Sequence, residues 1–285
     1  MSWLLLTLIS VLFRAIFGLM TKVISNKVKV STYTQATLLS LLAAMVAVLT
    51  SPLLGGINIS FDSEMVFMIG LIVISSGLGN VMYFEGMKSL TSGTAQISFS
   101  TILIFNVILS LVFLNLHLSP LNIFGIVMLA VAVLSVTTGK VELNKSGVIK
   151  MVISAFLFSI FQLTTSKISG QVSAATYMVI AYLGTVGVII LFKGKVIVDD
   201  IRNTSNKKSL LMTPLLGAIL SLGNYIFAYY AYRTAPEPTK VAMLLTSQVV
   251  VAVLLSYVFL NEKQQLGRKI MAAILVVISA ILIKS

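Results

Sequence analysis

Ten apolar stretches, each about as long as a membrane-spanning helix, divide the chain almost from end to end. A helix needs about 20 mostly apolar residues to cross the hydrocarbon core of a bilayer. In lipid only helices and closed barrels satisfy all backbone polar groups, and barrel strands are shorter and alternate apolar with polar residues. The stretches therefore predict an all-α integral membrane protein with ten transmembrane helices, near 3–22, 32–54, 65–88, 94–115, 120–139, 148–167, 174–193, 210–233, 240–260 and 266–283.

Composition supports this fold class and restricts the partners. Of the 285 residues, 58% are hydrophobic and 10% are charged, whereas soluble domains carry about 25% charged residues. The net charge is +12, but the basic residues lie in short gaps between the apolar stretches and form no basic face with interleaved aromatic residues, as nucleic-acid binding requires. We expect the lipid bilayer and a small-molecule substrate as partners, with protons as a candidate coupling ion, no nucleic acid, and a monomer or homodimer.

The residues that most enzymes and metal sites need are scarce. The chain has no cysteine and one histidine, His117. This excludes disulfides, zinc thiolates and a thiol nucleophile, and the apolar stretches lack the paired acids of a catalytic site. We therefore expect no enzyme, no catalytic residue, no cofactor and no metal.

The two halves of the chain repeat each other. Four short matches occur in the same order at offsets of 144 to 146 residues, and they pair FRAIFGLMTK at 13–22 with FSIFQLTTSK at 158–167, Thr32-Tyr33 with Thr176-Tyr177, LGN at 78–80 with LGN at 222–224, and FLN at 113–115 with FLN at 259–261. Such self-similarity predicts a duplication, with five helices in residues 1–142 and five in residues 143–285. An odd number of helices inverts the second unit, and inverted repeats are typical of secondary transporters whose substrate site lies between the repeats.

The basic residues also predict orientation. Fifteen of the 20 Lys and Arg residues lie in gaps on one side of the ten stretches, four lie on the other side, and Arg14 lies within a stretch. Cytoplasmic loops carry the excess of positive charge. The distribution therefore predicts a plasma-membrane protein with both termini outside.

Several motifs resemble those of the EamA-type drug/metabolite transporters. GMKSLTSGTAQI at 86–97 and AYRTAPEPTKVAML at 231–244 are similar to one motif of that family in its two repeats, and FLNEKQQ at 259–265 is similar to the end of its ninth helix. Lys22 matches the lysine that ends the family's first helix. The resemblance covers essentially the whole chain and implies ten helices and transport of a metabolite or drug, with both termini in the cytoplasm, opposite to the charge distribution.

Arg14, near the middle of the first stretch, is the leading site candidate. It shares one helical stripe with Thr7, Ser10, Gly18 and Thr21, and a weaker stripe in the sixth stretch holds Ser159, Gln162 and Ser166. A polar stripe in a membrane must face protein or a water-filled cavity, so we expect the two stripes to face each other across a cavity. The alternative is that Arg14 binds helix carbonyls and only stabilises packing.

Glu85 is the one carboxylate well inside an apolar stretch. It is therefore the candidate for binding a proton or the ammonium group of a substrate. The alternative is an ion pair with Lys88, three residues further on, near the lipid headgroups.

Further candidates are polar or aromatic side chains within the stretches: Asn80, Tyr83, Gln96, Ser100, Asn224, Tyr229, Arg233 and Gln248. Asn80 and Asn224 could instead join helices by hydrogen bonds, and the tyrosines could belong to an interfacial belt. Together these features predict a secondary transporter that moves a small polar or zwitterionic, amino-acid-like metabolite or drug by alternating access, with export as the candidate direction. The alternative is a lipid-handling or regulatory membrane protein without solute transport.

Overall fold

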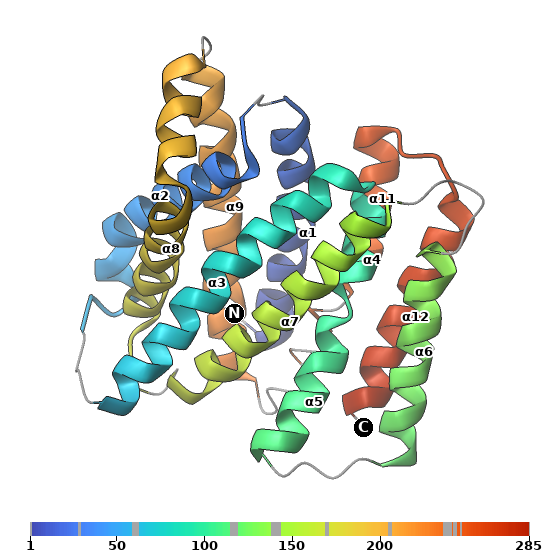
Figure 1. The fold of residues 1–285 in the computed structure, drawn as a ribbon. Coiled ribbons are helices and arrows are strands. Elements are labelled where there is room, and N and C mark those ends of the chain that lie inside the picture. Colours follow the sequence, from blue (N-terminus) through green and yellow to red (C-terminus); the bar gives the residue numbers. More distant parts are fainter. Residues whose placement is uncertain are drawn as a thin grey trace.

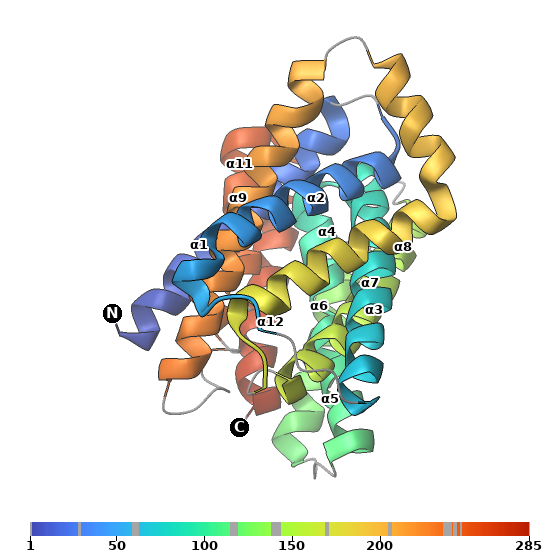
Figure 2. The ribbon, with the colours of Figure 1, turned by 90° about the vertical axis from the view of Figure 1, so that its left-hand side faces the viewer.

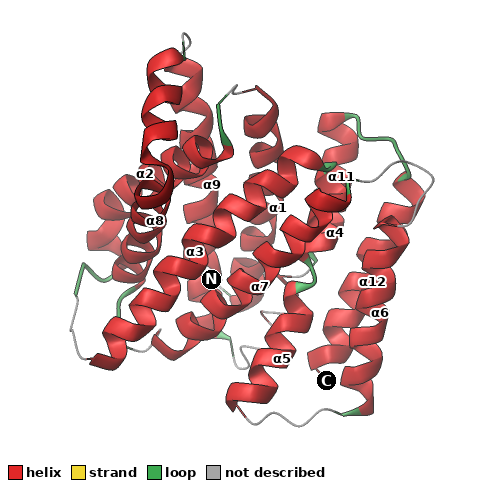
Figure 3. Cartoon of the chain, viewed as in Figure 1, coloured by secondary structure: helices red, strands yellow, loops and turns green. Residues whose placement is uncertain are grey.

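A computed structural model of the chain describes residues 2–27, 30–58, 63–114, 119–137, 144–168, 171–204, 207–235, 241, 244–245 and 247–284. Within these ranges the elements are helices, and no strand occurs (Figure 3). The helices are α1 (Trp3–Lys27), α2 (Thr32–Thr50), the 3₁₀ helix η1 (Ser51–Leu54), α3 (Ser63–Ser89), α4 (Ser92–Phe99), α5 (Ile102–Leu114), α6 (Pro120–Thr137), α7 (Lys145–Ile168), α8 (Ala174–Asn203), α9 (Lys207–Thr234), α11 (Gln248–Leu260) and α12 (Leu266–Lys284). His117, most of 236–246 and the side chain of Ser166 lie outside the described part.

The helices have the length and composition of membrane spans. Eight segments of the described chain are long and apolar enough to cross a bilayer, and two shorter apolar helices span Pro120–Val136 and Gln248–Leu260. The prediction of an all-α, multi-pass membrane protein is confirmed. That the two shorter helices also cross the bilayer stays a prediction.

The fourth predicted span is broken into two helices. Its α4 part ends at Phe99 and α5 begins at Ile102. The Ser100 hydroxyl donates to the Ile97 carbonyl, and the Thr101 hydroxyl donates to the Ser98 carbonyl at 2.9 Å. Hydroxyls that bind nearby carbonyls compete with the backbone ladder and bend helices, so adjacent Ser and Thr account for the break.

Helix α8 is longer than its predicted span at 174–193. The backbone bends at Lys193 (φ −137°, ψ 19°), and the helix then continues to Asn203. The C-terminal end of α8 and the N-terminal end of α9 project together beyond the neighbouring helices at the top of Figure 1. The carboxylate of Asp200 fixes this extension to the start of α2, because it accepts hydrogen bonds from the Ser31 N–H (2.9 Å) and the Thr34 hydroxyl (2.6 Å).

Helix packing follows a reciprocal pattern between the helices of the first half of the chain, α1 to α6, and those of the second half, α7 to α12. Helix α1 packs on α9 and α7 packs on α3; α2 packs on α9 and α8 packs on α3; α1 packs on α11 and α7 packs on α5. Two further pairs, α2 with α8 and α6 with α12, lie side by side (Figures 1 and 2). Exchanging the two halves of the chain leaves this pattern unchanged.

The repeated LGN motif marks two of these equivalent crossings. A Cβ atom on Gly79 would lie 3.2 Å from the ring of Phe158 on α7, and a Cβ atom on Gly223 would overlap the ring of Phe13 on α1. Phe13 and Phe158 are themselves equivalent in the repeat. Each glycine therefore lets its helix approach an aromatic side chain of the other half closely, as small residues do in membrane helix packing.

Candidate functional site

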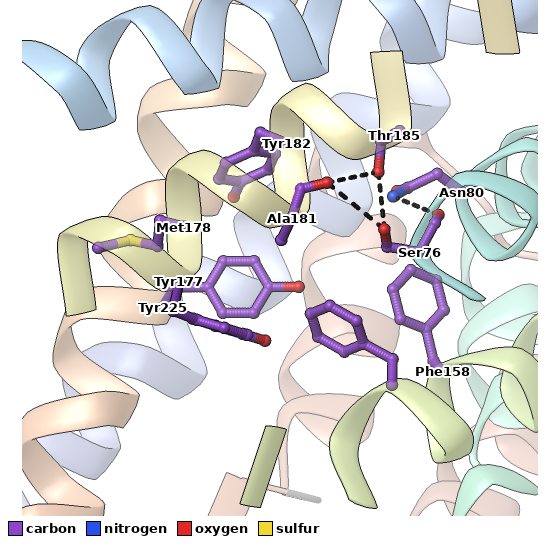
Figure 4. A pocket seen from close by; sticks show the side chains of 10 residues that line it. Ser76, Asn80, Phe158, Tyr177, Met178, Ala181, Tyr182, Thr185 and Tyr225 are labelled. Carbon is purple, nitrogen blue, oxygen red and sulfur yellow. Dashed lines mark hydrogen bonds between the residues drawn. The ribbon is translucent and has the colours of Figure 1, made fainter. Parts of the chain in front are cut away.

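A pocket lies among α3, α7, α8 and α9, well inside their spans (Figure 4). Its cavity volume is about 10 Å³, room for about one water molecule and far below the roughly 300 Å³ of a pocket that holds a small ligand. Helices from both halves contribute its lining, which consists of Ser76, Asn80, Phe158, Phe161, Tyr177, Met178, Ala181, Tyr182, Thr185 and Tyr225. None of these described side chains carries a charge.

One wall of the pocket is a hydrogen-bonded polar cluster between α3 and α8. The Thr185 hydroxyl lies 3.0 Å from the Ser76 hydroxyl and 2.9 Å from the Ala181 carbonyl. The side-chain N–H₂ of Asn80 donates to the Ser76 carbonyl at 2.9 Å. Within the described residues the amide oxygen of Asn80 has no hydrogen bond, so it can accept one from a bound molecule.

The opposite wall is aromatic. Tyr182 and Tyr225 pack edge to face with ring centroids 6.0 Å apart, and Phe161 packs on Phe158 (5.9 Å) and on Tyr177 (5.7 Å). Figure 4 shows the hydroxyls of Tyr177 and Tyr225 directed into the pocket. Aromatic rings with polar tips suit a ligand that has both an apolar body and a polar group.

Arg14 on α1 is not one of the lining residues, but its charge acts on one of them. It is half-buried and interacts electrostatically with the phenols of Tyr83 and of Tyr225, a lining residue. Gly18, one turn further along α1, leaves room for Gln96, whose side-chain N–H₂ donates to the Tyr83 hydroxyl at 2.6 Å. The structure thus brings three predicted site residues, Arg14, Tyr83 and Gln96, near one another, but none of them lines the pocket, to which Asn80 is the one predicted residue that contributes.

Asn224 and Gln162 take part in contacts between helices. The Ser10 hydroxyl of α1 lies 2.9 Å from the Asn224 side-chain oxygen and 3.0 Å from its carbonyl on α9. Gln162 on α7 accepts a hydrogen bond from Asn106 on α5 at 3.0 Å, and Asn106 accepts another from Ser159 at 2.8 Å. The stripe on α1 therefore contacts α9, and the stripe on α7 contacts α5.

Glu85 forms an ion pair with Lys150 of α7 at 2.7 Å and is absent from the pocket lining. The alternative pairing with Lys88 is therefore wrong. Helix α7 packs so closely here that a Cβ atom on Gly86 would overlap Met151. This close approach brings Lys150 within reach of Glu85, while Lys88 lies exposed.

The remaining predicted residues are dispersed. Ser100 lies at the break between α4 and α5, and Gln248 is buried at the start of α11, where its side-chain oxygen has no hydrogen bond to the described residues. Tyr229 packs edge to face on Tyr230 at 5.5 Å, and Arg233 is exposed near the end of α9.

Of the ten lining residues, sequence reasoning named Asn80 alone as a site residue; the polar and tyrosine side chains that it missed are Ser76, Tyr177, Tyr182, Thr185 and Tyr225. A signal was present, since Ser76 lies one turn before Asn80 and Tyr182 lies three residues before Thr185, so each pair shares a helix face.

A second polar cluster joins the two halves at one end of the bundle. The Lys22 ammonium donates to the carbonyls of Met87 (2.7 Å) and Leu90 at the end of α3. The Glu262 carboxylate accepts from the Ser92 N–H (2.9 Å) at the start of α4 and lies 3.8 Å from the Lys269 ammonium. Cations at helix C-termini and carboxylates at helix N-termini are stabilising, which gives Lys22 and the FLNEKQQ motif a physical role. The Lys22 contacts lie within the first half and the Glu262–Lys269 pair lies within the second, while the Ser92–Glu262 hydrogen bond joins the halves. We call this cluster the inter-half latch.

In the described part of the chain no group of three His, Asp or Glu side chains lies close enough together to hold a metal ion.

The helical bundle and the pocket formed by both halves define a class, that of multi-pass α-helical membrane proteins with a polar and aromatic site among their spans. The sequence model of the EamA-like transporter family matches residues 1–138 and 145–285. The chain belongs to this family of the drug/metabolite transporter superfamily, as the motifs in the sequence predicted.

Structural comparison agrees with this fold. A solved structure titled "Crystal structure of protein" is similar with a TM-score of 0.66 and 14% sequence identity, over 98% of this chain and 94% of that one. At this identity the similarity concerns the fold alone. No curated protein matches the sequence.

Proposed function

We propose that the protein is a secondary active transporter that moves a small polar or zwitterionic, amino-acid-like metabolite or drug across the plasma membrane by alternating access. The observation that carries this proposal is the pocket between helices of both halves, with a polar wall on α3 and α8 and an aromatic wall opposite (Figure 4). Membership of a transporter family supports it.

The mechanism needs two units that move against each other, and we assign them to residues 1–142 and 143–285 as inverted repeats. The reciprocal helix packing and the equivalent Gly79–Phe158 and Gly223–Phe13 contacts support this division. Rocking of one repeat against the other around a fixed site is the common form of alternating access. The pocket is too narrow here for an amino-acid-sized molecule, so in this proposal the state described is a closed one.

Orientation and direction are part of the proposal. We assign the end of the bundle with the inter-half latch to the cytoplasm and both termini to the outside, which the excess of basic residues on one side supports. Opening of the latch then admits a solute from the cytoplasm, and export follows when the opposite end opens.

Transport can be tested with the purified protein in liposomes. We expect uptake or release of at least one solute from a panel of radiolabelled amino acids, amines and carboxylates, stimulated by an imposed pH gradient, and none in protein-free liposomes. Scrambling of a fluorescent phospholipid without movement of any solute would contradict the proposal and support the lipid-handling alternative.

A further inference from the structure

We propose that the site beside Arg14 selects organic anions: it binds the carboxylate of a solute whose body is apolar or aromatic, and it discriminates against amines. This inference rests on the proposed function, because it takes the pocket as the transport site, and it names the charge class of the solute.

Arg14 differs from other charged side chains of the helices in the partners that it has. Lys22 binds the carbonyls that end α3, and Glu85 pairs with Lys150. Arg14, in contrast, has neither an ion pair nor a hydrogen bond with any described residue. A charged side chain inside a membrane is costly and is normally paired, so an arginine left in this state is suited to an anion that is supplied from outside the chain.

The residues one turn before and one turn after Arg14 on α1 show which parts of the bundle are near it. Ser10, one turn before it on α1, binds Asn224, which directly precedes the pocket residue Tyr225 on α9. Gly18, one turn after it, lies against Gln96 and the Tyr83 hydroxyl. The charge of Arg14 acts on the phenols of Tyr83 and of Tyr225, and in this proposal a solute in the pocket approaches it on the side of Tyr225.

The two phenols on which the charge of Arg14 acts can donate hydrogen bonds to a solute. The Tyr83 oxygen accepts the hydrogen bond from Gln96, which leaves its own proton available. The Tyr225 hydroxyl has no hydrogen bond to the described residues. Two phenol donors and a guanidinium fork match a carboxylate, which offers acceptors alone and binds arginine through two parallel hydrogen bonds.

The described lining of the pocket offers no acidic partner for an ammonium group. Among the described residues no acid lines the pocket, and the nearest sequence candidate, Glu85, is occupied by Lys150. Aromatic rings attract cations, but the charge of Arg14 opposes a cation here. For amino-acid-like solutes the site thus recognises the carboxylate end and leaves the amino end without a partner.

Four ligands with one skeleton test this selectivity: 3-phenylpropionate, L-phenylalanine, 3-phenylpropanamide and 3-phenylpropylamine. We expect calorimetric titration of the protein in nanodiscs to show the anion binding about tenfold more tightly than the neutral amide, and the amine most weakly. Equal affinities, tightest binding of the amine, or no binding of the anion would overturn the inference.

Three variants assign the selectivity to Arg14. Arg14→Gln should abolish the preference for the anion over the amide, and Arg14→Lys, which keeps the charge, should retain part of it. Arg268→Gln makes the same change at an exposed position of α12 and should leave the preference intact. An unchanged preference in Arg14→Gln would refute the assignment.

The result of the binding test can be distinguished from the result of the transport test in liposomes. Anion-selective binding by a protein that moves no solute in liposomes would uphold this inference and refute transport. Solute movement in which amines compete as well as anions would uphold transport and refute this inference.

Discussion

At the residue scale, Arg14 combines a long polar side chain with a position in the middle of a membrane helix. Its stripe continues through Ser10 and Gly18, and both neighbours contact other helices. The guanidinium of Arg14 forms no ion pair with an acid in the described part of the chain. A group kept in a state that costs stability is typical of a functional site.

We therefore expect Arg14→Gln to stabilise the protein in the absence of solute. Removal of an unpaired intramembrane charge should raise the free energy of unfolding by about 1 kcal/mol or more. Thermal unfolding of the purified variant measures the change. If Arg14 instead stabilises packing by binding carbonyls, the same substitution lowers the melting temperature.

Glu85 shows what a sequence can and cannot predict about a single residue. Its place inside an apolar stretch was visible, and so was the need for a partner. The partner, Lys150, lies 65 positions further on in another helix, and only the α3–α7 crossing brings the two together. Local spacing suggested Lys88, because helical neighbours are the contacts that a single stretch of sequence can reveal.

At the element scale, the packing of α1 on α9 and of α3 on α7 depends on two equivalent glycines. Gly223 faces the ring of Phe13, and Gly79 faces the ring of Phe158. The duplication in the sequence predicted that these motifs correspond. It did not predict that each glycine packs against an aromatic side chain of the opposite half, because a short motif does not show which way the helix is turned about its axis.

Gly223→Ala should therefore destabilise the protein by about 1–3 kcal/mol, because a methyl group overpacks the contact with Phe13. Gly187→Ala is the matched control, since a Cβ atom there meets nothing within 4 Å, and the better helix propensity of alanine should leave stability unchanged or slightly higher. Thermal melts of both variants make the comparison. Equal effects at the two positions would contradict the packing argument.

The inter-half latch is the second feature at this scale. Glu262→Gln removes the charge that interacts with Lys269 and with the start of α4, while the shape of the side chain is kept. We expect the end of the bundle to open more often. Because the chain has no cysteine, a single Ser98→Cys at a fully buried position of α4 can report this opening through its reaction with a maleimide.

The reaction should be several times faster in Glu262→Gln than in the parent Ser98→Cys protein. Asp199→Asn, which neutralises an exposed acid on α8, serves as the control and should leave the rate unchanged. Equal rates in all three proteins would show that the latch does not hold the bundle closed.

At the scale of the whole molecule, the all-α membrane fold could be predicted because lipid permits so few alternatives. The apolar stretches predicted the approximate place of the helices, while the number of ten membrane spans stays a prediction, since eight described segments are long and apolar enough to cross a bilayer. The break at Ser100 and the bend at Lys193 could not be predicted, since they depend on side-chain hydrogen bonds and on the docking of Asp200 at α2. Little of the pocket was predictable: Asn80 was named from the sequence, whereas Ser76 and Thr185 meet only through the packing of α3 on α8.

Membrane orientation is a prediction at this scale. Lys195→Cys on the extension of α8 and Leu53→Cys in η1 are both exposed, and the order of the spans places them on opposite sides. In intact cells a membrane-impermeant maleimide should label Leu53→Cys and should label Lys195→Cys only after the cells are opened. The reverse pattern would show that the termini lie in the cytoplasm.

The most direct test of the central claim is counterflow of a bound solute in proteoliposomes with a variant that fills the pocket. Ala181→Trp places an indole in the pocket, and Leu183→Trp places one on the exposed side of the same helix. If the solute crosses between the two halves through this pocket, labelled solute accumulates transiently with the native protein and with Leu183→Trp, and fails to accumulate with Ala181→Trp. Undiminished counterflow in a folded Ala181→Trp protein would contradict the account.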